Sequence, residues 1–147
     1  FPCWMIVKPG TEGSYYGFPA MKAGEFGGPA GMKMALHYPG TTTSPESIDR
    51  TVHPKDLDHL AAFTKEYIPG ASEKINDTAT CMYSNSPDEH FVIDHMPGTG
   101  KQVAVAWGFS GHGFKFVSVV GELVSQLVVD GGTDRSIDFL RADRLNS

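Results

Sequence analysis

The strongest candidate for chemistry in this chain is the stretch GFSGHGFKF, residues 108–116. It places His112 and Lys115 three residues apart, in a glycine-rich turn that leads into an apolar segment. Glycine lets a backbone approach a ligand closely, and the first turn of a helix offers free N–H groups and the positive end of its dipole. The pattern therefore predicts a site for a partner that carries or develops negative charge.

Two segments nearer the N-terminus also hold reactive or charged side chains. Lys33 and His37 are four residues apart in the strand-like segment 32–38, so they face the same side of that strand. Tyr16 lies in the aromatic run YYGFP. Each residue also has a plain structural interpretation, Lys33 and His37 as surface strand residues and Tyr16 as a core aromatic.

Cys81 is followed directly by Met82 and Tyr83. A free cysteine is most often a small buried apolar residue, and the other interpretation is a nucleophile or a point of covalent attachment. His112 and Lys115 have a plain alternative too, as a locally hydrogen-bonded imidazole and a solvated ammonium. Because Lys115 stands between two phenylalanines at the head of an apolar helix, we expect it to be buried and to need an anionic partner.

An acidic and histidine-rich segment, residues 88–95, contains ligand types that suit a metal ion. Its spacing matches no metal cage, and Glu89 and His90 would point to opposite faces of a strand. We therefore interpret the segment as a charged turn and predict no metal.

Turn residues and apolar periodicity divide the chain into short strands and two helices. The predicted strands are residues 3–7, 14–18, 32–38, 79–84, 90–94 and 102–107, with 136–140 as a final short strand, and the predicted helices are 54–67 and 114–128. The first three strands form an antiparallel meander that begins with a hairpin. Strands and helices in this order indicate an α+β fold with an antiparallel or mixed sheet.

Apolar residues within these elements give the expected core. The first helix should bury Leu57, Leu60, Ala61 and Phe63, and the second is apolar on most sides and should be largely buried. Trp4 and Trp107 are expected in the core.

Composition limits the possible partners. The net charge is −5 and there is no basic stripe, which argues against nucleic acid, and no apolar run is long enough for a membrane span. Two cysteines without a metal-binding spacing favour a reducing compartment, so we expect a cytoplasmic protein. The chain starts with a strand-like segment and no Met, and we interpret it as a fragment that lacks an N-terminal part.

The segments around Lys33, Cys81 and His112, with YSNSPDEHFVID at residues 83–94, resemble the C-terminal half of flavin amine oxidases of the monomeric sarcosine oxidase and N-methyltryptophan oxidase family. The resemblance implies that residues 1–80 belong to a substrate domain and residues 81–147 to an FAD-binding domain. No Gly-x-Gly-x-x-Gly fingerprint occurs in the chain. The resemblance further implies that the part absent from this chain is the dinucleotide-binding part.

By this resemblance, Cys81 holds FAD through a thioether, Lys115 binds the substrate carboxylate, and Lys33 promotes reaction with oxygen. The implied catalytic residues are Lys33, His37, His112 and Lys115; the substrate-binding residues are Tyr16, Tyr83 and Lys115; and the cofactor-binding residues are Cys81, Gly111, His112, Gly113, Phe114 and Lys115. Around Lys33 the chain departs from the family pattern, since Ala35 replaces a glycine and Leu36 a tyrosine.

The implied activity is oxidation of the C–N bond of secondary, N-methyl amino acids such as sarcosine, which gives an imine, then an aldehyde, and hydrogen peroxide. The substrate partners are a small amino acid and oxygen, and the missing N-terminal half is a partner within the polypeptide. The fragment alone is expected to be inactive and to hold no FAD. The alternatives are an oxidase of glycated or cyclic amino acids and a non-catalytic α+β binding module.

Overall fold

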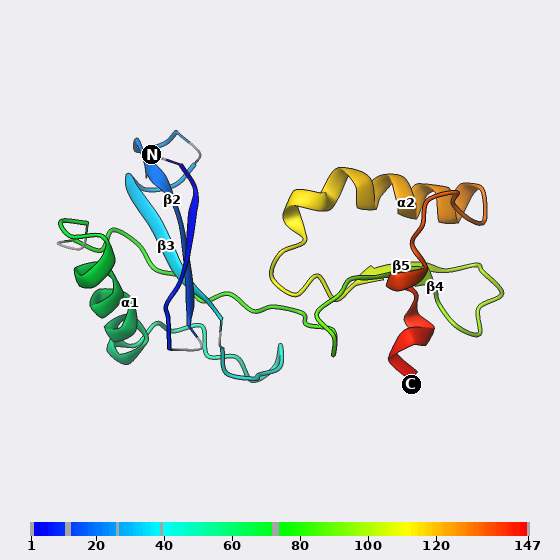
Figure 1. The fold of residues 1–147 in the computed structure, drawn as a ribbon, viewed down its shortest axis with the longest axis horizontal. Helices are drawn as coiled ribbons and strands as arrows, with labels where there is room; N and C mark the ends of the chain where they lie inside the picture. Colours follow the sequence, from blue (N-terminus) through cyan, green and yellow to red (C-terminus); the bar gives the residue numbers. More distant parts are fainter. Residues whose placement is uncertain (1, 11–12, 26, 39, 72–73, 147) are drawn as a thin grey trace. The chain divides into compact units, whose positions relative to one another are not determined.

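The computed structural model describes residues 2–10, 13–25, 27–38, 40–71 and 74–146. The chain divides into two compact units, Phe1–Met82 and Tyr83–Ser147, and each is described by itself below. Within the described residues, one unit has a three-stranded antiparallel sheet and the other a two-stranded antiparallel sheet, each beside one α-helix (Figure 1). The predicted α+β class is confirmed.

The first unit contains the predicted antiparallel meander. Its strands are β1 (Trp4–Val7), β2 (Ser14–Met21) and β3 (Gly31–Tyr38), with β2 in the centre. The pairing of β2 with β3 shifts by one residue, because Ser14 is opposite Tyr38 whereas Tyr15 is opposite Leu36. The extra residue is His37, and such a bulge bends the strand and changes the direction of a side chain.

Helix α1 (Pro54–Tyr67) begins and ends where the sequence predicts. Pro54 occupies the first helical position, where its missing N–H costs nothing. The carboxylate of Asp56 accepts the backbone N–H of His53 at 2.8 Å, which satisfies a donor at the start of the helix. Lys65 lies in the last turn, where its charge suits the helix dipole.

Aromatic stacking joins α1 to the sheet. The ring of Phe63 is buried and stacks on Tyr15 at 4.0 Å between centroids and on Trp4 at 6.0 Å. Trp4 lies across Gly17, where a Cβ atom would come within 2.3 Å of its ring, so the contact requires glycine. The predicted core is right for Phe63, but Ala61 is exposed and Thr64 is buried instead.

The second unit is a hairpin of β4 (Val92–His95) and β5 (Ala104–Trp107) with helix α2 (Val117–Val129) along one face (Figure 1). Its core is a cluster of Ile93, Leu123, Leu127 and Leu140. The chain then ends in two 3-10 helices, η2 (Asp138–Leu140) and η3 (Ala142–Asn146), which contact β4.

Four expectations are wrong in this unit and the segment before it. Residues 79–84 have no regular structure, and residues 136–140 include a 3-10 helix instead of a strand. Trp107 is 40% exposed. Helix α2 buries only Leu123 and Leu127, while its valines at 117, 128 and 129 are exposed. A sheet of two strands is only wide enough to cover one stripe of a helix.

Candidate functional site

The face of the meander that points away from α1 carries the predicted residues of the first unit. Trp4, Tyr15 and Met34 contact α1 from one face. Because side chains alternate along a strand, Tyr16 and Lys33 lie on the other face. Lys33 is opposite Phe18 on β2, and the bulge beside Tyr15 turns His37 to the ring of Tyr16.

Tyr16 is at the centre of this group. The ammonium nitrogen of Lys33 lies 5.7 Å from the centroid of the Tyr16 ring and 5.4 Å from that of Phe18. The imidazole of His37 meets the same Tyr16 ring edge-on, with the centroids 5.9 Å apart. The structure therefore brings Tyr16, Lys33 and His37 together, and of this arrangement the sequence predicted the shared face of Lys33 and His37.

Lys33 is exposed, and no carboxylate among the described residues pairs with it. A cation held over two aromatic rings gains from their negative faces, yet it keeps its charge available to a further partner. A cavity of about 350 Å³ in the same unit lies beside Tyr15 and Phe63, on the α1 side of the sheet. It is therefore separate from the group around Lys33.

The turn at residues 108–111 is sharply bent. Gly108 and Gly111 have φ values of 68° and 77°, and Ser110 has a φ of 48°, which is uncommon for a residue with a side chain. The ring of Tyr83 lies against Gly111 so closely that a Cβ atom there would come within 2.6 Å of it. The glycine therefore brings the predicted site residue Tyr83 next to the turn that carries His112.

The imidazole of His112 has a defined orientation. Its Nδ1 lies 3.0 Å from the carbonyl oxygen of Ser110, and because a carbonyl only accepts, Nδ1 carries the proton. The ring also packs against Phe91 at 4.9 Å between centroids. In its neutral form, His112 is then left with Nε2 as an acceptor on an exposed ring.

The prediction that Lys115 is buried is wrong for this chain. Residues Phe114–Phe116 form a 3-10 helix, η1, and Phe114 is 93% exposed. Lys115 is exposed as well, and its ammonium nitrogen lies 5.4 Å from the centroid of the Phe116 ring. Within the described residues no carboxylate pairs with Lys115.

The start of α2 suits a negatively charged group. No side chain caps the N–H groups at Phe116, and the first turn contains no acidic residue. The N–H groups of Phe116 and Val117 already donate to the carbonyls of Gly113 and Phe114, so the start of α2 offers the positive end of its dipole together with the charge of Lys115. The ring of Tyr83 occupies the space beside Gly111, and the ring of Phe109 occupies the space beside Gly113. Both glycines therefore shape the turn by allowing this close packing.

Cys81 is exposed and forms no disulfide, and it lies in the irregular segment that ends the first unit. The alternative of a buried apolar cysteine is therefore wrong. An exposed thiol is accessible for covalent attachment of a ligand. Cys3 is also free and exposed.

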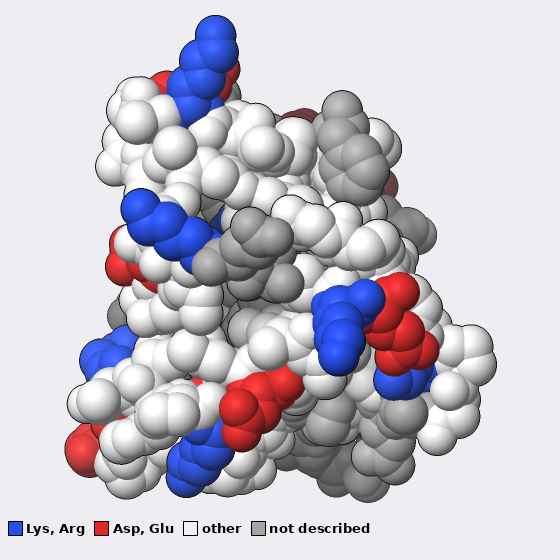
Figure 2. Space-filling view, turned by 90° about the vertical axis from the view of Figure 1, so that its left-hand side faces the viewer, with Lys and Arg blue, Asp and Glu red and all other residues white. Residues whose placement is uncertain are grey.

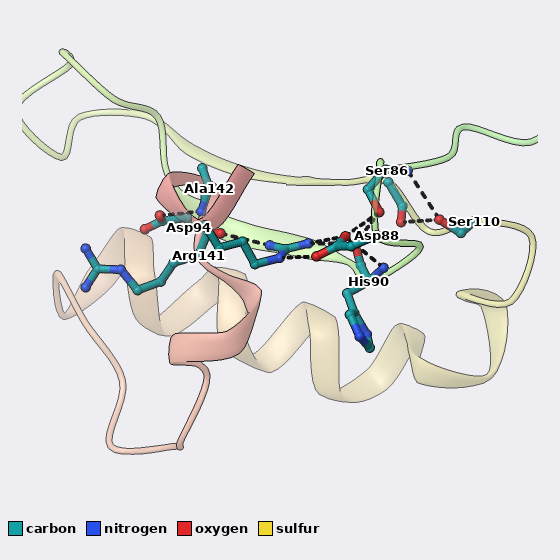
Figure 3. Close-up of polar contacts among 9 residues, drawn as sticks. Ser86, Asp88, His90, Asp94, Ser110, Arg141 and Ala142 are labelled. Atoms are coloured by element: carbon teal, nitrogen blue, oxygen red, sulfur yellow. Dashed lines mark hydrogen bonds and ion pairs between the residues drawn. The ribbon is translucent and has the colours of Figure 1, made fainter. Parts of the chain in front are cut away.

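The acidic segment at residues 88–95 begins as a charged turn and continues as strand β4. Asp88 accepts two hydrogen bonds from the guanidinium of Arg144, at 2.8 and 3.0 Å (Figure 3). These bonds hold the pKa of Asp88 well below its usual range. Across the part of the chain that is described, no group of three or more metal-ligating side chains occurs.

Charges of both signs are interspersed on the face drawn in Figure 2, with large uncharged areas between them. Neither sign of charge dominates that face. Among the described residues there is no helix of the length and apolar character that a membrane crossing needs.

Two residues that contact His112 were not identified from the sequence, namely Phe91 and Ser110, and neither was Arg144, which contacts the turn before Phe91. Ser110 lies inside the GFSGHG turn, and its position between two glycines was a usable signal. Phe91 and Arg144 have no local signal, because Phe91 meets His112 and Arg144 meets Asp88 only in the folded unit.

Comparison with known proteins gives one family model, described as FAD dependent oxidoreductase (DAO), which matches residues 10–127. Among curated proteins, the chain is 44% identical over 146 residues to the monomeric sarcosine oxidase of Bacillus sp. (strain B-0618), a match that covers 98% of this chain and 35% of that protein. It is 45% identical over 130 residues to the monomeric sarcosine oxidase of Streptomyces avermitilis, covering 88% of this chain and 33% of the relative.

A more distant match is the N-methyl-L-tryptophan oxidase of Escherichia coli, 33% identical over 146 residues, with 98% of this chain and 37% of that protein covered. The chain thus spans about a third of the length of the curated relatives that it matches.

Proposed function

This chain belongs to the FAD dependent oxidoreductase family, and on that premise we propose that the whole protein is an oxidase of secondary amino acids such as sarcosine. The observation that carries the proposal is the family match over residues 10–127, joined by identities above 40% to monomeric sarcosine oxidases. The clustering of Tyr16, Lys33 and His37 on one open sheet face supports it.

The residues of this chain fit an FAD cofactor. The start of α2 has the positive end of the helix dipole, no acidic residue in its first turn and Lys115 beside it, which suits the electron-rich edge of a flavin ring. Cys81 provides an exposed thiol, and we propose that this sulfur holds the cofactor covalently. When bound, FAD accepts two electrons from the C–H bond next to the substrate nitrogen and passes them to oxygen.

Lys115 binds the substrate carboxylate in this proposal. Its ammonium is exposed and has no carboxylate partner among the described residues, so it does not have to break an ion pair in order to bind one. A charge-assisted hydrogen bond between an ammonium and a carboxylate also orients the substrate. Tyr16 and Tyr83 are the proposed substrate-binding tyrosines, and each offers an apolar ring with a hydroxyl at one end.

His112 presents Nε2 as an acceptor, because Nδ1 donates to the Ser110 carbonyl. In that state it can accept a hydrogen bond from an N–H group of the substrate or cofactor. His37 is held edge-on against Tyr16, and in our proposal it takes part in catalysis. Lys33 stabilises the negative charge that develops on oxygen as electrons reach it.

The overall reaction is balanced. The amino acid loses two electrons and two protons to give an imine, oxygen gains them to give hydrogen peroxide, and water hydrolyses the imine to an amine and an aldehyde. For an N-methyl substrate the aldehyde is formaldehyde. Since the 147 residues contain no Gly-x-Gly-x-x-Gly motif, we expect the isolated chain to be inactive.

The test uses the full-length protein. Anaerobic addition of sarcosine should bleach the flavin absorbance, and readmission of air should release hydrogen peroxide. If no secondary amino acid, N-methyl, cyclic or glycated, reduces the flavin, the proposed function is wrong.

The covalent bond is tested separately. After acid precipitation, flavin should remain on the wild-type polypeptide and on Cys3→Ser, and should be released from Cys81→Ser. Cys3 is the matched control, because it is the other exposed free cysteine. Complete release of flavin from the wild type would contradict the attachment.

A further inference from the structure

The guanidinium of Arg144, in η3, makes four hydrogen bonds to described residues. Its Nε and Nη2 donate to the two carboxylate oxygens of Asp88 at 2.8 and 3.0 Å. Nη2 also donates to the carbonyl of His90 at 2.9 Å, and Nη1 to the carbonyl of Arg141 at 2.8 Å. The Arg144 side chain is only 17% exposed. A two-pronged arginine–carboxylate pair of this kind fixes orientation as well as distance.

These contacts hold one tight turn, residues 86–90, at the entry to β4 (Figure 3). Ser86 is 3% exposed, and its hydroxyl donates to the His90 carbonyl at 2.6 Å. The Asp88 carboxylate accepts the backbone N–H of His90 at 3.2 Å, inside the same turn. Glu89 has a φ of 60°, a conformation that needs support from its surroundings. Arg144 thus donates to the Asp88 carboxylate and to the His90 carbonyl, which are also the acceptors of the hydrogen bonds within the turn.

The turn reaches His112 by two routes. The first is polar. The Ser86 N–H donates to the hydroxyl of Ser110 at 3.3 Å, and that hydroxyl donates to the Gly108 carbonyl at 3.0 Å. The carbonyl of Ser110 in turn accepts Nδ1 of His112.

The second route is aromatic. Phe91, directly after the turn, packs its ring against Phe109 at 5.0 Å, His112 at 4.9 Å and Phe116 at 5.4 Å between centroids. The imidazole is therefore held on one side by a carbonyl and on another by a phenyl ring. Both supports depend on the position of residues 86–91.

We propose that Arg144 is a positioning residue for His112: its paired hydrogen bonds to Asp88 and His90 fix the turn that sets the place and protonated nitrogen of the His112 ring. The consequence for catalysis rests on the proposed function, because that proposal places His112 beside the substrate. The contacts themselves lie within one unit of the chain and do not depend on it.

The first test measures backbone hydrogen exchange in the full-length protein with its cofactor. The variant Arg144→Gln keeps a polar hydrogen-bonding group but is shorter and loses the charge and the two-pronged guanidinium. We expect exchange of the amides of Ser110 and His112, which bond to Ser84 and Phe109, to rise roughly tenfold or more. Exchange in α2 should stay at the wild-type rate.

The matched control is Arg141→Gln. Arg141 lies in the same C-terminal segment and pairs with Asp143 at 2.9 Å, and among the described residues its side chain forms no hydrogen bond or ion pair with the turn. Only its backbone carbonyl accepts from Arg144, and the substitution leaves that carbonyl in place. We expect wild-type exchange at residues 108–113. Arg144→Lys keeps the charge but not the two-pronged guanidinium, so its exchange rate at residues 108–113 should lie between those of Arg144→Gln and the wild type.

The second test reads the imidazole directly. The ¹⁵N signals of His112, assigned with His112→Gln, should show protonated Nδ1 in the wild type and an averaged pair of nitrogens in Arg144→Gln. Unchanged exchange at residues 108–113 together with unchanged ring signals in Arg144→Gln would overturn the proposal. If instead both change as expected and His112→Gln keeps wild-type turnover, the positioning holds and the proposed role of His112 in the reaction is the part that fails.

Discussion

The ammonium nitrogen of Lys33 lies 5.7 Å from the centroid of the Tyr16 ring, and the imidazole of His37 meets the same ring edge-on at 5.9 Å. Tyr16 belongs to the central strand and the other two belong to its neighbour, β3. The one-residue bulge between these strands turns His37 to the ring. A tyrosine thus holds a cation and an imidazole on one exposed sheet face.

Lys33→Met should slow reoxidation of the reduced flavin in the full-length protein, by roughly a hundredfold, and leave flavin reduction within a few-fold of the wild type. The reason is that oxygen develops negative charge only in the second half-reaction, where a fixed cation stabilises it. Stopped-flow absorbance measures the two half-reactions separately. Lys22→Met, in the exposed loop after β2, is the control and should behave as the wild type. Slower reduction with normal reoxidation would reject the oxygen role.

Lys115→Ala should raise KM for sarcosine, by roughly a hundredfold, because a charge-assisted bond to the substrate carboxylate is lost. Steady-state oxygen uptake at varied substrate concentration gives KM and kcat. Lys74→Ala removes another exposed lysine and should leave both values unchanged. Wild-type kinetics in Lys115→Ala would remove Lys115 from the site.

Gly111→Ala should destabilise the protein by about 2 kcal/mol, since the backbone has a positive φ and the new methyl group would overlap the Tyr83 ring. Gly121→Ala is the matched comparison, because Gly121 is inside α2 with open space around it. There we expect a gain of up to about 1 kcal/mol from helix propensity. Urea unfolding of the full-length variants gives both values, and equal effects would contradict this account of Gly111.

The pair of Asp88 and Arg144 should make stability depend on acid. Hydrogen bonds from Arg144 lower the pKa of Asp88 in the folded state below its ordinary value of 3.8. The contribution of the pair is therefore complete above that ordinary value and is lost as the pH falls towards the folded pKa. Asp88→Asn should be less stable than the wild type at neutral pH. Its urea midpoint should stay nearly constant over the acid range in which the wild-type midpoint falls.

Asp134→Asn is the control for this titration, because Asp134 is exposed and forms no ion pair among the described residues. Its urea midpoint should follow the wild type at every pH. An Asp88→Asn midpoint that falls with acid as steeply as that of the wild type would show that the pair does not carry the effect.

The elements with strong local signals were predictable from the sequence. Helix α1 has proline at its first position and a Pro69-Gly70 stop after its end, so its bounds follow from local chemistry. The meander follows from alternation along residues 32–38 and from the turn residues between the first two strands. The same alternation placed Lys33 and His37 on one face.

Neither the missing strand at residues 79–84 nor the exposure of several apolar side chains was predictable in the same way. Residues 79–84 have strand-like composition but no partner strand, and composition alone cannot supply the hydrogen bonds that a strand needs. Trp107 and the valines of α2 are apolar yet exposed, and Lys115 is exposed between two phenylalanines, because the two-stranded sheet covers only one side of the helix.

The sequence by itself determined which residues could do chemistry, the α+β class, and the resemblance that the family match supports. Only the tertiary structure decided which of them meet: Tyr83 against Gly111, Phe91 against His112, and Arg144 against Asp88. The physical reason is range. Turn, cap and periodicity signals act over a few residues, whereas Arg144 and Asp88 are 56 residues apart and meet only because β4 and η3 pack together.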